Sequence, residues 1–446
     1  MAGLFNALNA ARTSLEVNQK SIEVVGNNIS NVNTPGYSRQ YTELSPYPSI
    51  NFEGFFVGQG VRVTNIRRDH SVFLQNQLVS KSSDFGYQNS QTRPLAELER
   101  VFAITEENIA TDVDRFFDSM QELAANPSDL VLRDQVIRRG SLLATNFNNT
   151  INQIDTIGDN INDSMLAKMR SINSKIQEVA TLNDRIHTIE INGQDANTPR
   201  DRREQLARDL AISVGAQSYY TKDGMMTIQL PGGLPLIQGK SAMDLEAVTT
   251  GATLRIDLHA GGVTRTLTDH NLGGEFHGLV HLKNELIPSL KDDLDQLAYQ
   301  ITTRVNTQHA LGAGLDGNTG RNFFADPPNI GAAPPVNPWL DAARTMQVAL
   351  DKAEHIAAAA APFIGPGDNR NMLILANLDE QPAMNGVDTF NSYYGKLTAQ
   401  IGLETRQNGL SVQGAKDALD QLENLRDGLS GVSLEEEMID LIQYQR

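Results

Sequence analysis

The first thirty or so residues carry apolar side chains at intervals that alternate between four and three. This spacing places one narrow stripe along a helix, and the remaining faces carry small or polar residues. Gly26 and several asparagines weaken the helix, and Pro35-Gly36 ends it. Such a stripe needs a partner, which for an ordinary terminal helix is its own domain. We call the stripe the terminal seam; it consists of Leu4, Leu8, Ala11, Leu15, Asn18, Ile22, Val25, Ile29 and Val32.

Beyond an extended stretch, the pattern predicts long helices. Helical spacing returns near Asp69 and continues to Leu123, and Ser128 or Asp129 can cap the helix that follows. The apolar stripe between residues 130 and 191 contains no proline. One continuous helix over this range would be roughly 90 Å long, at about 1.5 Å per residue. A helix of that length belongs to a rod-like bundle.

The period then shortens toward two, which predicts strands between residues 212 and 276. Helical spacing resumes after Gly278, and a final helical block from about Phe390 precedes a fresh helix start capped by Ser433. We read Glu435 to Glu437 at that start as a complement to the helix dipole. The fold class is therefore α+β and multidomain: a rod-like bundle of long helices with an inserted β-rich domain.

The predicted organisation has seven segments. They are an amphipathic assembly helix (1–40), a first helical core part (41–210), the β-rich insert (211–276), a returning helix (277–312), a loop and mixed segment placed with the β-rich domain (313–378), the last core part (379–432) and the start of a C-terminal assembly helix (433–446). A stripe of Leu434, Met438 and Leu441 runs along that last helix, which is barely three turns long and therefore marginal by itself.

Composition excludes several classes of partner and binding site. The formal net charge is −17, without a basic cluster to neutralise phosphates, which argues against nucleic acid and anionic membranes as partners. No apolar window approaches the ~20 residues needed to span a bilayer, and the N-terminus lacks the pattern of a signal peptide. The chain contains no cysteine, so disulfides and thiolate metal sites are excluded. Proteins are the expected partners.

Several motifs resemble a known family. The run NNISNVNTPGYSRQ, from Asn27 to Gln40, is similar to the N-terminal motif of the axial proteins of the bacterial flagellum, which are the rod, hook and hook-associated proteins. The ending Tyr37 to Gln40 resembles the hook-associated group. Further matching stretches are Asn126 to Asp129, Arg202 to Leu206, Gly273 to Phe276, Asn306 to His309, Phe323-Phe324, Gly367 to Asn369 and Ser433 to Glu437.

The resemblance implies a structural role. Terminal helices would pair into a coiled-coil-like inner domain on assembly, and a ring of copies on the distal hook would join hook to filament. Implied partners are the hook protein, a second hook-associated junction protein, further copies of this chain and a cytoplasmic export chaperone at the C-terminal region. The family is extracellular and leaves through the flagellar type III apparatus without a cleaved signal peptide. Its C-terminal helix normally runs some thirty residues further, so self-assembly of a chain ending at Arg446 is open to question.

The residues expected at the assembly interface come from the seam, the turn that follows it and the last helix. They are Leu4, Leu8, Ala11, Leu15, Ile22, Val25, Asn27, Asn28, Ile29, Asn31, Val32, Pro35, Gly36, Tyr37, Leu434, Met438 and Leu441.

Three local patterns suggest other chemistry, and each has a simpler interpretation. The run GGLPLIQGKS, ending at Ser241, has the wrong spacing for a phosphate-binding loop and fits a hairpin better. His277 and His281 could share a metal ion, but no third ligand is evident. The stretch from Asp316 to Gly320 lacks the later glutamate of a calcium loop and reads as a turn.

No cofactor, metal site or catalytic group is therefore predicted, and the expected function is not enzymatic. Two alternatives remain. A hook or rod subunit would share the N-terminal motif but not the stretches at Asn126 and Gly273. A flagellum-associated wall hydrolase would need a pair of carboxylates in a cleft, which the sequence does not display.

Overall fold

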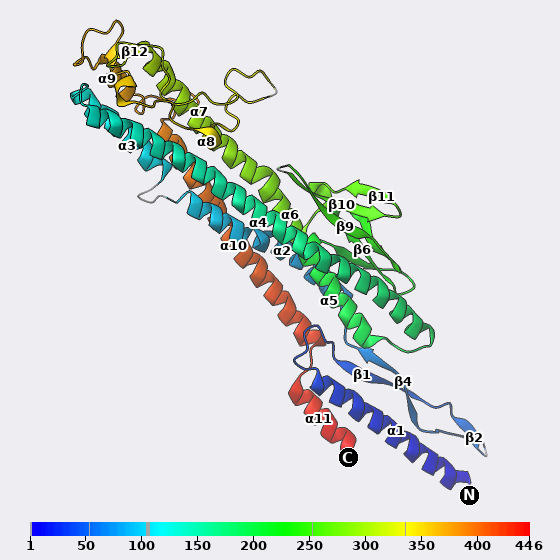
Figure 1. The fold of residues 1–446 in the computed structure, drawn as a ribbon. Helices are drawn as coiled ribbons and strands as arrows, with labels where there is room; N and C mark the ends of the chain where they lie inside the picture. The colour runs from blue at the N-terminus through cyan, green and yellow to red at the C-terminus, as the bar shows by residue number, and fades with distance from the viewer. Residues whose placement is uncertain (1, 53, 104–107, 252, 335) are drawn as a thin grey trace.

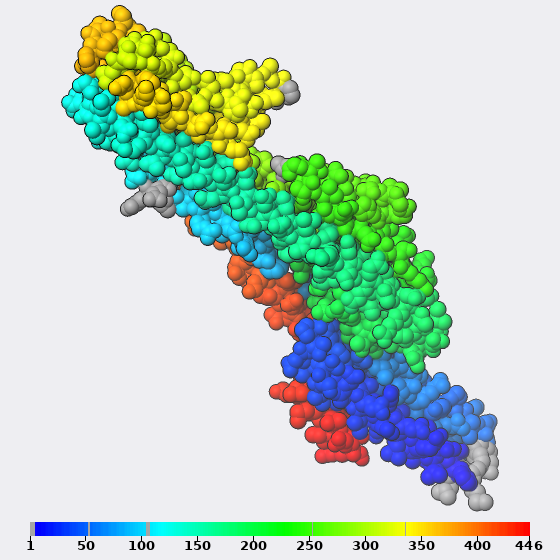
Figure 2. Space-filling view, viewed as in Figure 1, coloured from blue at the N-terminus to red at the C-terminus, as the bar shows by residue number. Residues whose placement is uncertain are grey.

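Long helices run side by side along an elongated molecule (Figure 1). The computed structural model describes residues 2–52, 54–103, 108–251, 253–334 and 336–446. The first and last helices lie at one end of the rod, and the segment that carries α9 and β12 lies at the other (Figures 1 and 2). The predicted α+β class with a bundle of long helices is confirmed.

Two helices set the length of the body. They are α4 (Leu130–Ile191) and α10 (Phe390–Ser430), of 62 and 41 residues. The single helix predicted from Leu130 is confirmed, and Asp129 caps it by accepting the N–H of Val131 at 2.7 Å. The helices around these two are α2 (Val72–Val101), α3 (Ile109–Ala125), α5 (Asn197–Val214), α6 (Gly274–His281) and α7 (Ile287–Leu311), with a π-helical turn (Leu282–Leu286) between the last two.

The body is held together by aliphatic and phenylalanine side chains where these helices meet. Helix α2 packs against α5, α6 and α10, and α3 packs against α4. The helical run predicted between residues 69 and 123 is in fact two helices, since α2 ends at Val101 and Asn108 caps α3 by accepting the N–H of Thr111 at 2.8 Å. Phe116 and Phe117 of α3 lie in the core, where both are fully buried.

The strands predicted between residues 212 and 276 are confirmed as two antiparallel sheets. The first has the order β5–β6–β7–β8 and the second β11–β10–β9. The bounds are β5 (Gln217–Tyr220), β6 (Met226–Leu230), β7 (Leu234–Gln238), β8 (Ser241–Ala242), β9 (Asp244–Thr250), β10 (Thr253–Ala260) and β11 (Val263–Thr266). Both sheets lie on one side of the rod, beside α4 and α6 (Figure 1).

Helix asparagines fasten these sheets to the body. Asn183 of α4 donates to the carbonyl of Met226 at 2.8 Å and accepts its N–H at 3.0 Å. Asn173 likewise donates to the carbonyl of Leu245 in β9 at 2.8 Å and accepts the N–H of Leu245 at 3.0 Å. Each side-chain amide thus offers a strand residue the donor and acceptor that a neighbouring strand would offer.

The same arrangement recurs in the π-helical turn, where Asn284 donates to the carbonyl of Leu254 at 2.7 Å and accepts its N–H at 2.9 Å. A polar helix face and a strand can therefore pack together without leaving buried backbone groups unpaired. The spacing of residues along a helix does not indicate which strand an asparagine meets, so these contacts were not predicted from the sequence.

A β-ribbon accompanies the first helix, α1 (Ala2–Ser30). Strand β1 (Gln40–Pro46) pairs antiparallel with β4 (Val61–Arg68), and the short strands β2 (Ile50–Phe52) and β3 (Phe55–Val57) extend the ribbon. The ribbon runs beside α1 at the end of the rod (Figure 1). This fits the extended chain predicted after the first helix.

The mixed segment between residues 313 and 378 lies elsewhere than predicted. It was placed with the β-rich domain, but its helices α8 (Ala342–Thr345) and α9 (Arg370–Ala376) pack on α3, α4 and α7 at the far end of the rod (Figure 1). Its strands β12 (Gly312–Ala313) and β13 (Ala359–Ala360) pair with each other. The buried side chain of Arg133 fixes the segment by donating to the carbonyl of Ile356 at 2.7 Å, a tie that strand propensity cannot indicate.

Candidate assembly interface

The terminal helix α1 is covered along a face that lies beside the terminal seam. Thr13, Val17, Ser21, Val24 and Asn28 are buried, at intervals of four and three. The ribbon supplies part of this cover, because the Ser21 hydroxyl lies 3.0 Å from the hydroxyl of Thr42 in β1. The buried positions are occupied by valine and by small polar residues, whereas the leucines and isoleucines of α1 lie on the neighbouring stripe.

Much of the terminal seam remains exposed. Leu8 and Leu15 are 66% and 70% exposed, Ala11 is exposed and Val32 is 36% exposed. The side chain of Leu4 lies outside the described part of the chain.

Toward the end of α1 the seam becomes covered. Ile22 and Ile29 are half-buried and Val25 is 5% exposed. The predicted stripe is thus open toward the N-terminus and closed where the last helix, α11 (Leu434–Gln445), packs beside α1 (Figure 1).

Helix α11 adds a second exposed apolar face at the same end of the rod. Leu434 and Met438 are 46% and 52% exposed, while Leu441 is half-buried. Ile439 and Ile442 are exposed as well. The predicted N-cap is confirmed, since Ser433 accepts the N–H of Glu436. A single chain therefore presents exposed aliphatic side chains on both of its terminal helices.

A buried asparagine joins the two terminal helices. Asn28, 1% exposed, donates to the carbonyl of Gln40 at 2.8 Å and to the carboxylate of Glu437 at 2.9 Å. Its carbonyl oxygen accepts the Tyr37 hydroxyl at 2.9 Å and the Gln40 N–H at 3.0 Å. All four hydrogen bonds available to a side-chain amide are made. We call Asn28, Tyr37, Arg39, Gln40 and Glu437 the terminal joint.

Arg39 completes the terminal joint. It binds the carboxylates of Glu437 and Asp440 on α11, the latter at 3.0 Å, and its own N–H donates to the carbonyl of Ser430 at 2.8 Å. Glu437 is fully buried, so it does more than complement the helix dipole, which was its predicted role. Its negative charge is matched by Arg39 and by the amide of Asn28, which makes its burial tolerable.

A second polar cluster ties the same turn to the helical body. The N–H of Ser38 donates to the carboxylate of Asp201 in α5 at 3.2 Å. Arg68 of β4 bridges Asp201 and Glu204, and the Tyr220 hydroxyl donates to Glu204 at 2.8 Å. Burial acts to raise the pKa of Glu204, but the charge and hydrogen bond of Arg68 outweigh it and hold that pKa below its ordinary value.

The tetrapeptide from Tyr37 to Gln40 is therefore a junction of elements. Tyr37 and Gln40 bind α1, Ser38 binds α5, and Arg39 binds α11 and the end of α10. Burial, together with the carboxylates of Asp201 and Glu437, raises the pKa of Tyr37 to about 12. The end of the predicted N-terminal motif, Tyr37 to Gln40, thus lies where α1, α5, α10 and α11 meet.

The rest of the predicted turn is largely exposed. Asn27 and Pro35 are exposed, and Asn31 donates to the Asn27 carbonyl at 2.9 Å. Gly36 has a φ of 81° and lies against Arg208, which suits a glycine because other residues rarely adopt that backbone conformation. These residues shape the turn, while Asn28 and Tyr37 carry its buried contacts.

Comparison with known proteins gives a consistent answer. A family model described as the flagellar hook-associated protein FlgK helical domain matches residues 95–324, which is more than half of the chain. The chain belongs to the flagellar hook-associated protein FlgK family. A model described as a flagella basal body rod protein matches residues 6–37, the region of the terminal seam.

Curated members of the family match almost the whole chain. Flagellar hook-associated protein 1 of Escherichia coli strain K12 is 25% identical over 98% of this chain and 95% of its own length. The protein of the same name from Bacillus subtilis strain 168 is 25% identical over 100% of this chain and 94% of its own. A solved structure of the flagellar hook junction protein FlgK from Burkholderia pseudomallei matches with a TM-score of 0.71 at 17% identity, covering 79% of this chain and 99% of that one.

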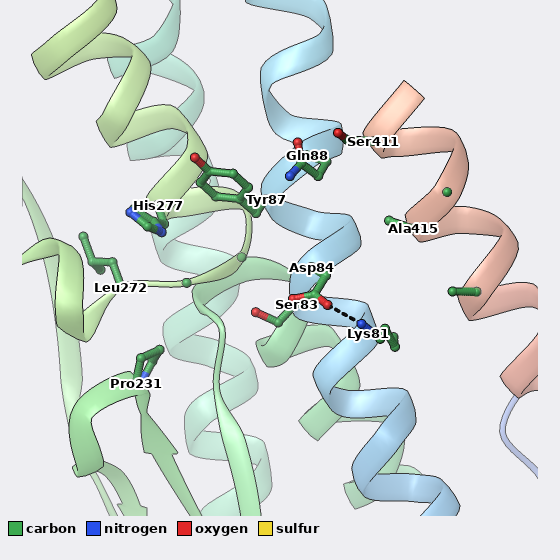
Figure 3. A pocket seen from close by; sticks show the side chains of 14 residues that line it. Lys81, Ser83, Asp84, Tyr87, Gln88, Pro231, Leu272, His277, Ser411 and Ala415 are labelled. Atoms are coloured by element: carbon green, nitrogen blue, oxygen red, sulfur yellow. Dashed lines mark hydrogen bonds and ion pairs between the residues drawn. The ribbon is translucent and has the colours of Figure 1, made fainter. Parts of the chain in front are cut away.

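The other predicted patterns take their simpler interpretations. His277 lines a hollow of about 550 Å³ between α2, α6 and α10, with its ring 5.0 Å from that of Tyr87 (Figure 3). His281 instead pairs with Glu285 at 3.0 Å. The phosphate-loop-like run forms β7 and its turns to the neighbouring strands β6 and β8, and Asp316 pairs with Arg321 at 2.6 Å within its turn.

Two features are absent from the described residues. Among them, no group of three or more His, Asp or Glu side chains could hold a metal ion. Within the same ranges, no helix is both long enough and apolar enough to cross a bilayer.

The sequence did not predict the charged residues that hold the turn after α1 in place. Glu437, Asp201 and Arg68 were not among the expected site residues, although two signals were available. Arg39 belongs to the N-terminal motif, and Asp201 lies directly before the matching stretch that begins at Arg202. Charged residues are almost never fully buried unless they are paired, so a buried position for either residue would have implied a partner of opposite sign.

Proposed function

We propose that copies of this chain form a ring on the distal end of the flagellar hook and connect the hook to the filament. The observation that carries this proposal is the open apolar surface of α1 and α11, where Leu8, Leu15 and Met438 are each more than half exposed. Paired terminal helices with exposed aliphatic faces need further chains to cover them. The match to hook-associated protein 1 over nearly the whole chain supports the same role.

The partners follow from this role. They are the hook protein, a second hook-associated junction protein, further copies of this chain and, before export, a cytoplasmic chaperone at the C-terminal region. The chain would act outside the cell and leave it without a cleaved signal peptide. It would work by surface complementarity and not as an enzyme.

A hook or rod subunit is less well supported. The rod-protein model covers residues 6–37, which the axial proteins have in common, whereas the hook-associated helical domain covers 95–324. A wall hydrolase has no specific support, because the buried carboxylates of Asp201 and Glu204 are both held in ion pairs with the guanidinium of Arg68.

Electron microscopy of cells that lack the gene tests the proposal, with an immunoblot of the medium for flagellin. Bare hooks together with monomeric flagellin in the medium are expected, because hook assembly and export would continue without the junction. Rods without hooks would place the chain in the rod or hook class. Normal filaments would refute a structural role at the junction.

A further inference from the structure

Several long helices cross one level near the middle of the body. A groove of about 380 Å³ lies there between α2, α4 and α6, and its lining includes Pro94, Ile157 and Leu279. Helix α10 reaches the same level, because the Thr405 hydroxyl lies 3.5 Å from the carbonyl oxygen of Leu95. We call this plane the mid-body level.

Each of these helices contains a weak helix former close to the mid-body level. Pro94 lies inside α2 and has no N–H to donate to the carbonyl four residues earlier. Helix α6 continues through the π-helical turn into α7, whose second residue is Pro288. Internal prolines and π-helical turns are the places where long helices bend. Helices α4 and α10 carry Gly158 and Gly402 there, and glycine is a poor helix former.

The contact between α4 and the π-helical turn is made at one of these glycines. The side chain of Lys283, 9% exposed, crosses Gly158, where an added Cβ would lie 2.6 Å from the Lys283 Nζ. The carboxylate of Asp159 is 3.9 Å from that Nζ, which is too far for a hydrogen bond. The two helices therefore meet here through a single long side chain and not through interlocking apolar residues.

Two lateral parts of the chain are attached on opposite sides of this level (Figures 1 and 2). Toward α5, Asn173 and Asn183 of α4 hold the two sheets, and Asn284 adds a tie at the level itself. Toward α9, Asn148 of α4 donates to the carbonyl of Ala343 at 2.8 Å and holds the segment that carries α8. Figure 2 shows these two parts separated along the rod.

We propose that the body bends at the mid-body level, so that the two lateral parts move as separate rigid units. The main cluster of buried apolar residues continues through the level, from Leu95 and Ile157 to Leu282. The bend is therefore a tilt with small sliding of packed helices, and the core stays closed.

The bend goes beyond the proposed function and does not depend on it, because it belongs to a single chain. It changes the direction of the end that carries α9 relative to the terminal helices. The terminal joint, at the opposite end of the rod, stays undisturbed (Figure 1). A body of this kind can meet two neighbours whose relative orientation varies.

Distances between spin labels on the purified full-length chain measure the bend. The chain contains no cysteine, so pairs of cysteines introduced at exposed positions carry the only labels. Thr249 in β9 and Gln347 beside α8 form the pair across the level, while Thr249 with Thr181 and Gln347 with Ser141 are pairs within one side. We expect the distance distribution across the level to be at least about twice as wide as within either side.

Two substitutions strengthen the helices at the level. Pro94→Ala restores the missing N–H of α2, and Gly402→Ala favours helix in α10 without a close contact, since the nearest atom lies 4.0 Å from the added Cβ. Together they are expected to narrow the distribution across the level by about half and to leave the pairs within each side unchanged. Gly428→Ala, in open space roughly seven turns further along α10, is the matched control and should change none of them.

Each outcome decides the proposal. Thermal unfolding checks that the variants fold, and Gly402→Ala alone carries the test if the double variant does not. A wild-type distribution across the level as narrow as within each side would overturn the bend. A folded variant whose distribution stays as wide as that of wild type, or equal narrowing by Gly428→Ala, would overturn its location at the mid-body level.

Discussion

Replacing Asn28 by aspartate tests whether the terminal joint holds α11 in place. The change keeps the size of the side chain and the oxygen that accepts from Tyr37 and Gln40. It replaces the amide nitrogen, which donates to the Gln40 carbonyl at 2.8 Å and to the Glu437 carboxylate at 2.9 Å, by a second oxygen. Two acceptors then face that oxygen in a buried site.

The size of the effect on α11 follows from the contact to Glu437, because the Gln40 carbonyl belongs to β1. A lost hydrogen bond to a neutral partner costs about 1 kcal/mol and one to a charged partner about 1.5 to 3 kcal/mol. Two carboxylates without a donor between them add to this, as when one partner of a buried ion pair is removed. We expect the docking of α11 to weaken by about 3 to 5 kcal/mol in Asn28→Asp. Since α11 has 12 residues, it does not persist as an isolated helix.

Amide hydrogen exchange measures this directly. Protection of amides in α11 is expected to fall more than about a hundredfold, since 1.36 kcal/mol corresponds to a factor of ten. Exchange in α4 should stay unchanged, because the main cluster of buried apolar residues begins at Leu95 and includes no residue of α1 or α11. Asn27→Asp is the matched control, since Asn27 is exposed and uses only its oxygens to accept from Asn31.

Two results would contradict the reasoning. If Asn28→Asp leaves the protection of α11 as in wild type, the joint does not hold the helix. If Asn27→Asp has the same effect as Asn28→Asp, a general change of charge in the turn is responsible, and the specific contact to Glu437 is not.

Further predictions concern the body. Asn183→Leu removes both backbone contacts to β6 and should lower the free energy of unfolding by about 2 to 4 kcal/mol, whereas Asn160→Leu on the exposed face of α4 should change it by less than about 0.5 kcal/mol, both by urea titration. Gly86→Ala would place a methyl group 2.1 Å from a carbonyl oxygen of α5 and should cost about 2 to 3 kcal/mol, while Gly409→Ala, with open space around it, should be neutral or stabilising. Burial raises the pKa of Asp295 to about 6, above its unfolded value, so its contribution is complete below about pH 4 and is lost as the pH rises through 6; the melting temperature of wild type minus that of Asp295→Asn should therefore fall between pH 4 and 7, and a constant difference would contradict this.

Local patterns predicted the elements well. The apolar stripe without proline from Leu130 was sufficient for α4, because a helix is specified by the spacing of its own side chains and the absence of breakers. The period of two between residues 212 and 276 was likewise sufficient for the strands of both sheets. The cap at Ser433 followed from one residue type beside an acidic turn.

The candidate interface was predicted only in part. Leu8 and Leu15 are exposed on the predicted stripe, but Val25 is buried because α11 and the ribbon close over that part of α1. The segment between residues 313 and 378 was assigned to the wrong neighbours. Periodicity describes which face of an element is apolar and carries no information on which distant segment covers it.

By itself, the sequence determined the long helices, the inserted strands, the exposed terminal stripe and the family. The tertiary structure alone decided that Asn28 meets Glu437, 409 residues later, and that Ser38 meets Asp201, 163 residues later. Apolar stripes can be read locally because burial of aliphatic groups needs no particular partner. A buried amide or carboxylate is tolerated only when a specific donor or acceptor meets it, and the folded chain alone brings such partners together.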